Sequence, residues 1–200
     1  MSAKKRANLA VACGGAGMLI KVVDQITDED LHEAVWTMYL DCFEELNTLA
    51  VQRHLMFREE FDEVMLDSRV HKYVAYDDDG SLCGVATYTN DLGAVPLIAP
   101  QYFERHWPEH YAAQKIWYIG FVAVSPHAQG REAFAQLVEQ MYLVASAQNG
   151  LVGLDIRSYN DDVRRMSRVF RLLVSRMSGT MRFNRIDQQS YWLYEFPSAA

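Results

Sequence analysis

The sequence predicts an α+β (α/β) domain built on one central, mixed and twisted sheet of about seven strands flanked by about four helices. Short apolar or alternating runs, typical of strands, are separated by longer stretches with the period of an amphipathic helix. The apolar run 115–124 leads directly into a helical pattern and then a second apolar run, which is typical of a βαβ unit with parallel strands. Because 50% of the residues are hydrophobic, the chain can bury a sizeable core.

The N-terminal half predicts two helices and a hairpin. Residues 1–18 are expected to form a flexible tail, and residues 19–200 a single domain. Residues 19–26 predict a strand, 27–46 a helix capped by Thr27 or Asp28, and 56–68 a shorter helix. Residues 71–89 predict a hairpin, with turn chemistry at 77–80. Residues 90–111 are broken by prolines and predict a long loop with one helical turn, a length that is uncommon without a function.

The C-terminal half begins with the apolar strand 115–124. This strand carries apolar residues on both faces, so we expect it to lie in the interior of the sheet. A helix over 132–148, a strand over 150–158 and a helix over 161–177 follow from the changes in period. Two further strands, 180–186 and 190–196, are predicted to close the chain as a hairpin.

Charge and cysteine content restrict the class of partner. The net charge is −7, yet residues 157–200 carry eight Lys and Arg against four Asp and Glu. A predominantly acidic chain argues against general nucleic-acid binding, while the basic C-terminal quarter suits an acidic partner. The three cysteines are widely spaced, which argues against a disulfide framework or a metal site and favours a reducing, cytoplasmic location. No apolar run reaches the roughly 18 residues of a membrane span.

The turn after strand 115–124 could bind a phosphate. Gln129, Gly130 and Arg131 are expected to form a loop, and the amides of residues 130–134 would point outward at the start of the next helix. Unpaired amides and the helix dipole favour an anionic diphosphate at such a position, and Arg131 adds a charged contact. An ordinary strand-to-helix turn is the alternative interpretation.

The element order and the stretch "VAVSPHAQGREAF" resemble the GCN5-related N-acetyltransferase (GNAT) superfamily. In that family a central strand ending in V-x-P precedes a loop that binds the pyrophosphate of coenzyme A. Glu132 and Phe134 stand where the family has small residues, which weakens the match to an ordinary coenzyme A site. The resemblance implies a GNAT fold and a thioester donor held by Val122, Val124, Gln129, Gly130, Arg131, Glu132, Ala133, Phe134 and Asn160.

The layout of residues 73–124 is also similar to acyl-homoserine-lactone synthases and N-acyl amino acid synthases. The lactone synthases take their acyl chain from an acyl-carrier protein. Trp117 and Val124 match their strand pattern, but Tyr118, Gly120 and Phe121 replace its acid, serine and arginine. This resemblance therefore implies only that an acyl-carrier protein is a plausible donor, beside acetyl-CoA or a longer acyl-CoA.

Acyl transfer to an amine needs a group that accepts the amine's proton. Tyr118 and Asp155, on neighbouring predicted strands, are the candidate catalytic residues. Tyr88, Asp91 and Gly120 are candidates for contacting the acceptor. In relatives an Asn after the fifth strand is followed about seven residues later by a Tyr that protonates the leaving thiolate. Here Asn160 fits the first position and Ser167 occupies the second. A purely structural role is the alternative for each polar candidate.

Arg164, Arg168 and Arg171 follow a helical spacing on the predicted helix 161–177. They form either an ordinary solvated face or a docking surface for an acidic carrier protein or a coenzyme A phosphate. The sequence as a whole predicts an N-acyltransferase that moves an acyl group from acyl-CoA or an acyl-carrier protein to a primary amine of a small molecule or peptide. A non-catalytic binding or regulatory protein with a degenerate coenzyme A loop is the alternative.

Overall fold

The protein is described by a computed structural model, which covers residues 10–11, 18–51, 53, 55–96, 98–126, 128–177 and 181–195. Within these ranges the chain forms one sheet, in the order β1-β2-β3-β4-β5-β6. The strands are β1 (Ala10–Val11), β2 (Leu19–Val23), β3 (His71–Tyr76), β4 (Leu82–Thr89), β5 (Ile116–Val124) and β6 (Leu151–Leu154). Neighbouring described strands run antiparallel except for β5 and β6, which run parallel. The predicted mixed sheet and its βαβ unit are therefore confirmed.

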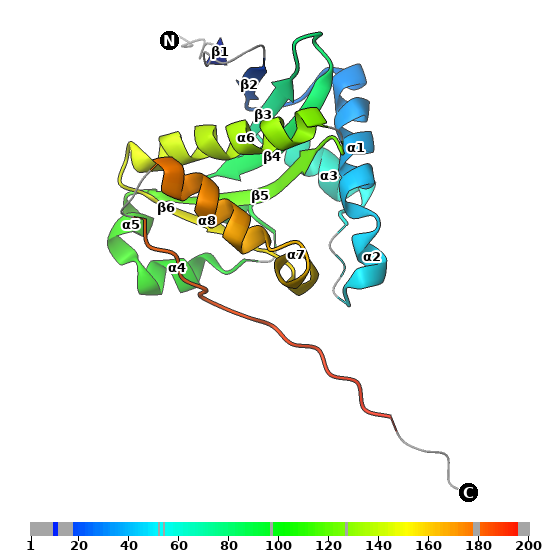
Figure 1. The fold of residues 1–200 in the computed structure, drawn as a ribbon. Coiled ribbons are helices and arrows are strands. Elements are labelled where there is room, and N and C mark those ends of the chain that lie inside the picture. The colour runs from blue at the N-terminus through cyan, green and yellow to red at the C-terminus, as the bar shows by residue number, and fades with distance from the viewer. Residues whose placement is uncertain are drawn as a thin grey trace, which may run out of the picture.

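Helices cover both faces of this sheet (Figure 1). They are α1 (Glu29–Phe43), α2 (Leu46–Leu49), α3 (Arg58–Leu66), α4 (Pro100–His106), α5 (Pro108–Ala112), α6 (Ala128–Ser146), α7 (Ser158–Asp162) and α8 (Met166–Met177), with a 3-10 turn, η1, at Leu92–Ala94. Asp28 caps α1 through its carboxylate, which accepts a hydrogen bond from the amide of Leu31 at 2.8 Å. The predicted α1, α3 and β3–β4 hairpin are thus confirmed, and the hairpin turn places Gly80 at a φ of 85°.

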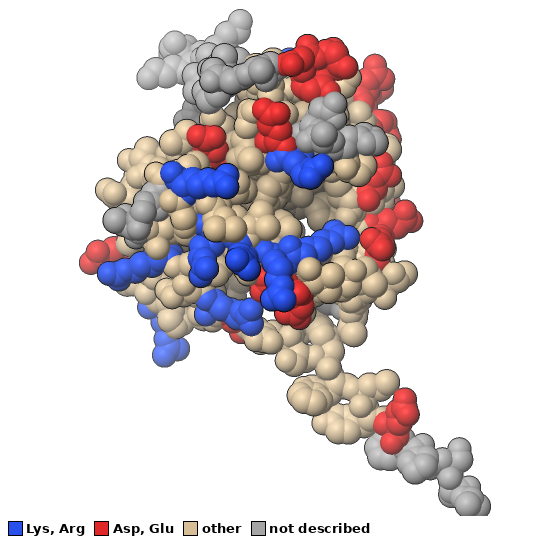
Figure 2. Space-filling view, viewed as in Figure 1, with Lys and Arg blue, Asp and Glu red and all other residues tan. Residues whose placement is uncertain are grey.

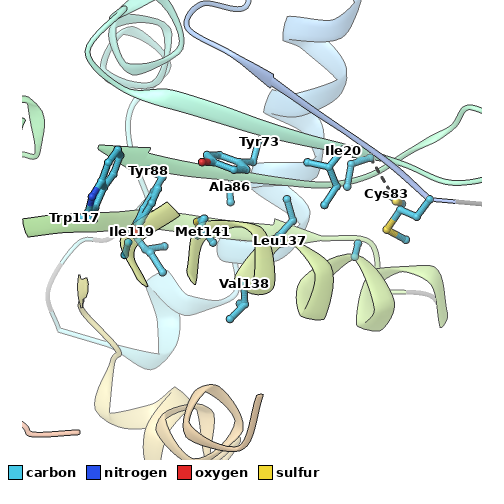
Figure 3. Close-up of a cluster of buried hydrophobic side chains, with 14 residues drawn as sticks. Ile20, Tyr73, Cys83, Ala86, Tyr88, Trp117, Ile119, Leu137, Val138 and Met141 are labelled. Atoms are coloured by element: carbon cyan, nitrogen blue, oxygen red, sulfur yellow. Dashed lines mark hydrogen bonds between the residues drawn. The ribbon is translucent and has the colours of Figure 1, made fainter. Parts of the chain in front are cut away.

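The largest hydrophobic cluster lies between α6 and the sheet, as Figure 3 shows. Leu137 and Met141 of α6 pack there on Ala86, Tyr88 and Ile119 of the central strands. Tyr88 stacks on Trp117, with ring centroids 4.7 Å apart. A second cluster joins α1 and α3 to the other face, and a third packs α4 against the start of β5 on that same side. Alternating β5 side chains therefore contribute to cores on both faces, as predicted for an interior strand.

A buried lysine ties the start of β3 to the preceding loops. The Lys72 ammonium donates hydrogen bonds to the backbone oxygens of Asp24, Asp67 and Val70, at 2.7 to 2.8 Å. Its side chain is fully buried, and this desolvation lowers the pKa of Lys72 to about 8. The three carbonyl oxygens give the buried ammonium the acceptors that it needs.

Three predicted elements are wrong. The proline-rich segment 90–111 contains η1, α4 and α5 rather than one helical turn, because Pro100 and Pro108 each occupy the first position of a helix, where proline is tolerated. The expected helix 161–177 is two helices, α7 and α8, separated where Arg165 adopts a φ of 56°. The described residues 181–195 form no strand, so the sheet has six described strands rather than about seven.

The C-terminal segment shows why strand propensity was not sufficient. The first part of the segment contacts the body, where Arg185 pairs with Asp161 and the Tyr102 hydroxyl donates to the Ile186 oxygen. Beyond it the chain runs away from the body with exposed side chains, including Trp192 and Leu193 (Figure 1). An isolated hairpin is only marginally stable without a sheet edge or helix against which to pack. At the opposite end, Ala10–Val11, within the segment predicted as a flexible tail, pair with β2, while residues 1–9 and 12–17 of that prediction lie outside the described residues.

Candidate active site

The parallel strands β5 and β6 separate beyond their first four residue pairs. They are paired from Ile116–Leu151 to Ile119–Leu154, but β5 continues to Val124 whereas β6 ends at Leu154. A cavity of about 290 Å³ lies at this separation. Its lining comes from both layers of helices, including Tyr39 and Phe43 of α1 on one side and Phe134 of α6 and Phe170 of α8 on the other. The fold therefore leaves an opening through the sheet beside β5.

A β-bulge in β5 borders the cavity. Ala86 pairs with Val122 and Tyr88 pairs with Ile119, so β5 carries one more residue than β4 over this interval. The amide of Phe121 donates to Thr87 Oγ1 at 3.1 Å. A side chain at Gly120 would place its Cβ only 2.6 Å from the same oxygen. Glycine is therefore required for this close approach, and bulges of this kind are common beside active sites.

The bulge also decides which way the amides of β5 point. The amides of Phe121 and Ser125 point toward β4, since they donate to Thr87 and to the backbone oxygen of Cys83. Backbone N–H groups alternate in direction along a strand. The amides of Val122 and Val124 therefore point to the opposite side, where β6 no longer runs alongside. Val122 and Val124 are among the residues that the family resemblance implies hold the donor.

The two predicted catalytic residues are in contact. The Tyr118 hydroxyl donates to Asp155 Oδ1 at 3.1 Å. Tyr118 reaches this position because its ring lies over Gly153 of β6 and against Phe103 of α4, whose ring centroid is 6.4 Å away. A Cβ at Gly153 would lie 2.9 Å from the Tyr118 ring. Both residues line the cavity.

This environment shifts both pKa values upward. Burial, together with the neighbouring carboxylate, raises the pKa of Tyr118, so its hydroxyl remains protonated and acts as a donor. Asp155 is open to solvent as a residue, yet the protein around its carboxyl group desolvates it and raises its pKa, against the opposing effect of the Tyr118 hydrogen bond. A carboxylate with a raised pKa is a better proton acceptor than an ordinary aspartate.

Three further polar groups of the cavity lining have no hydrogen-bond partner. They are the hydroxyl of Tyr88, Nη1 of Arg157 and Oδ1 of Asn160, all three buried atoms. Sequence reasoning proposed Tyr88 and Asn160 but missed Arg157. The available signal was its position two residues after Asp155, which places both side chains on the same side of an extended chain. Unsatisfied polar atoms at a cavity are available to form hydrogen bonds with a ligand or with water.

The backbone conformation predicted for the phosphate-binding loop is wrong, because these residues are helical. Gln129, Gly130 and Arg131 lie in the first turn of α6, which begins at Ala128, so the helical amides without a helical partner are those of residues 128–130 rather than 130–134. Gly130 needs no positive φ there, and its neighbours are good helix formers. The side chain of Gln129 lies outside the described residues. Glu132 is exposed, and its carboxylate accepts from the Gln136 amide at 3.1 Å.

The other predicted site residues are distributed over three places. Gly120, Val122 and Phe134 line the cavity, whereas the Ala133 side chain is buried between α6 and the sheet. Asp91 lies elsewhere: its carboxylate accepts from the Gly93 amide at 3.0 Å and borders a separate cavity of about 350 Å³. The last group is the predicted docking set, Arg164, Arg168 and Arg171, which lies on the surface.

The three arginines are all exposed, but only two share a helix. Arg168 and Arg171 lie on α8, while Arg164 lies between α7 and α8. Arg164 Nη2 is 3.5 Å from a carboxylate oxygen of Glu45, and its guanidinium lies over the Tyr159 ring. Figure 2 shows that Lys and Arg gather on this face, where α7 and α8 lie in Figure 1. The predicted basic surface is therefore present, but its three arginines do not form one continuous row along a single helix.

Comparisons with known proteins define the class. The sequence matches the model of the acetyltransferase (GNAT) family over residues 30–169. The chain therefore belongs to the GNAT acetyltransferase family, and its fold is the GNAT fold. No curated protein sequence gives a significant match. Among the described residues no group of three His, Cys, Asp or Glu side chains is placed to hold a metal ion, and no described helix is long and apolar enough to cross a membrane.

Solved structures support the same fold. The chain is similar to a GNAT-family acetyltransferase from Listeria monocytogenes, with 12% identity, a TM-score of 0.51 and coverage of 81% of this chain and 90% of that one. A tetramutant of the BH1408 protein from Bacillus halodurans gives 12% identity, a TM-score of 0.52 and coverage of 86% and 99%. At these identities the similarity concerns the fold alone.

Proposed function

We propose that the protein is an N-acyltransferase that moves an acyl group from a thioester, acetyl-CoA or another acyl-CoA or an acyl-carrier protein, to a primary amine of a small molecule or peptide. The observation that carries this proposal is the cavity between the separated strands, with the Tyr118–Asp155 pair on its wall. Family membership supports the reaction class, and the cavity supplies the place for it.

In this proposal, the backbone of β5 binds the thioester of the donor. The thioester carbonyl would lie against the amides of Val122 and Val124, which point toward the opening between the strands. Hydrogen bonds from such amides favour the negative charge that develops on the carbonyl oxygen when the amine attacks. The first-turn amides of α6 lie just beyond the end of β5, where they suit the phosphate of the donor.

In this proposal, Asp155 and Tyr118 accept the proton of the acceptor amine. The neutral amine attacks the carbonyl carbon, a C–N bond forms and the C–S bond breaks. The proton that the nitrogen loses passes to the Asp155 carboxylate, directly or through the Tyr118 hydroxyl, which is hydrogen-bonded to it. The thiolate leaves and takes a proton from solvent, since Ser167 stands where relatives place a tyrosine and its amide is bonded to Asp161.

Two donor classes remain in the proposal. Glu132 puts a negative charge on the first turns of α6, which disfavours a diphosphate. Arg168 and Arg171 of α8, with Arg164, suit either the phosphates of coenzyme A or an acidic carrier protein. Replacing Arg164 and Arg168 by Glu is expected to slow a carrier-protein reaction through association, with a loss that shrinks at high salt, because screening weakens surface charge effects.

Glu132 and Phe134 also favour a second candidate, a binding or regulatory protein that has kept the GNAT fold without the chemistry. Calorimetry with acetyl-CoA, longer acyl-CoAs and acyl-carrier proteins, followed by thiol release with a panel of amines, separates the two. Donor binding with amine-dependent thiol release supports the enzyme. Donor binding without thiol release for any amine contradicts the enzyme. Amine-dependent thiol release that Asp155→Asn does not slow contradicts the role of Asp155 as the proton acceptor.

A further inference from the structure

Arg157 is a charged group of the cavity that the proposed chemistry does not use. It follows β6 in an extended backbone conformation, with φ −63° and ψ 147°, and lines the cavity. Nη1 of its guanidinium is buried without a hydrogen-bond partner. Among the described residues, no Asp or Glu oxygen makes an ion pair with it, whereas Arg58, for comparison, contacts both Glu33 and Asp62.

An uncompensated cation in a cavity wall is costly. Desolvation lowers the pKa of Arg157 to about 10, which still leaves it charged near neutral pH. Buried charges in proteins are generally paired or hydrogen-bonded, because water that they lose must be replaced. A charged arginine without a protein partner is therefore suited to an anion that arrives with a ligand.

The position of Arg157 indicates which ligand carries this anion. Arg157 and Tyr39 of α1 both line the cavity, and each affects the pKa of the other, so the guanidinium lies toward the α1 side of the sheet. It lies two residues after Asp155, the proposed proton acceptor. Phe134 and Phe170, on the other side, come from α6 and α8, where the phosphate end of the donor would lie. The anion therefore belongs with the amine acceptor rather than with the phosphates of the donor.

We infer that the acceptor is an amine that also carries a carboxylate, of the amino-acid or short-peptide class, and that Arg157 binds this carboxylate. A planar carboxylate matches the fork of a guanidinium, and two parallel hydrogen bonds would fix its orientation. With the carboxylate on Arg157, the amine of the same molecule is held toward Asp155. Asn160 Oδ1, a buried acceptor without a partner three residues further on, can take an N–H from the ligand. The inference rests on the proposed function and assigns its acceptor.

The test compares each acceptor with a partner that lacks only the charge. Calorimetry of the intact protein would use a panel of amino acids and dipeptides together with their C-terminal amides. We expect binding of carboxylates, about 10- to 100-fold weaker binding of the amides, and a similar loss in Arg157→Met, the factor typical of removing a hydrogen bond to a charged group. Arg157→Lys, which keeps the charge without the fork, should retain part of the affinity. Arg176→Met, on exposed α8 surface, is the matched control and should bind as the wild type does.

Three results would overturn the inference. Amides that bind as tightly as the acids, or an Arg157→Met protein that is folded and binds the acids normally, would each remove Arg157 from recognition. A preference for acyl-CoA donors with a free carboxylate on the acyl group, lost in Arg157→Met, would assign the carboxylate to the donor instead. Failure of the proposed function looks different: Arg157-dependent binding of carboxylates without any acyl transfer contradicts catalysis but supports the site.

Discussion

Gly153→Ala tests whether the placement of Tyr118 matters for catalysis. The new Cβ would lie 2.9 Å and 3.1 Å from two carbons of the Tyr118 ring. Carbon atoms in ordinary contact are about 3.5–4.0 Å apart, so the ring must move by roughly 0.5–1 Å. The hydrogen bond from its hydroxyl to Asp155 is already 3.1 Å long, and a shift of that size away from Asp155 would break it.

The structure predicts different sizes for the two effects of this substitution. Overpacking costs about 1–3 kcal/mol, and replacing a strand glycine by alanine recovers about 0.5–1 kcal/mol, so we expect a net loss near 1 kcal/mol. For a chain of this size that lowers the Tm by about 2–4 °C. Activity should fall further, by about 10- to 100-fold in kcat/KM, because a displacement near 1 Å has that effect on a reacting geometry.

The assay is thiol release from the donor with the best acceptor, beside a thermal melt of each variant. A double-mutant comparison isolates the mechanism: in a Tyr118→Phe background, which lacks the hydroxyl, Gly153→Ala should cost little additional activity. Wild-type kcat/KM in a folded Gly153→Ala protein would refute the reasoning. So would losses that simply multiply in the double variant, because they would show that the two residues act independently.

Three further predictions concern pH, stability and the donor. Because activity needs the ionised carboxylate of Asp155, kcat/KM should rise with pH as this carboxyl group, whose pKa is raised, loses its proton. Tyr118→Phe removes a hydrogen bond that lowers the pKa of Asp155, so it should move this rise in kcat/KM to higher pH. Wild-type and Tyr118→Phe profiles that superimpose after scaling would contradict this. Lys72→Met should lower the free energy of unfolding by about 2–4 kcal/mol in denaturant titration, since three buried or part-buried carbonyl oxygens lose their donor, whereas Lys21→Met should change it little; equal effects would contradict a stabilising role for Lys72. Glu132→Gly should tighten acetyl-CoA binding severalfold in calorimetry by removing a negative charge near the diphosphate, and unchanged affinity would place the diphosphate elsewhere.

The sequence predicted the elements whose partners are close in the chain. The β3–β4 hairpin, α1 with its Asp28 cap and the β5–α6–β6 unit follow from turn chemistry and hydrophobic period, and each is present. The failures occur where the outcome depends on a distant contact. Whether residues 181–195 form strands depends on a sheet edge that they do not reach, and no local pattern reveals that.

The candidate site, like the fold, could be predicted from the sequence only in part. Tyr118 and Asp155 could be brought together from the sequence because parallel neighbouring strands fix their relative position. The bulge at Gly120 could not, since it reflects a close contact with Thr87 on another strand. Arg157 was missed because an arginine at the end of a strand is ordinarily solvated, and only the cavity shows that one of its nitrogens is buried.

The opening between β5 and β6 has a consequence for the order of events during turnover. Since its lining reaches the helices on both faces of the sheet, the two substrates of the proposed reaction can approach from opposite sides. Neither has to leave before the other enters. Initial-rate plots at several fixed concentrations of the second substrate should then give intersecting rather than parallel lines, and each product should compete only with the substrate whose side of the sheet it shares.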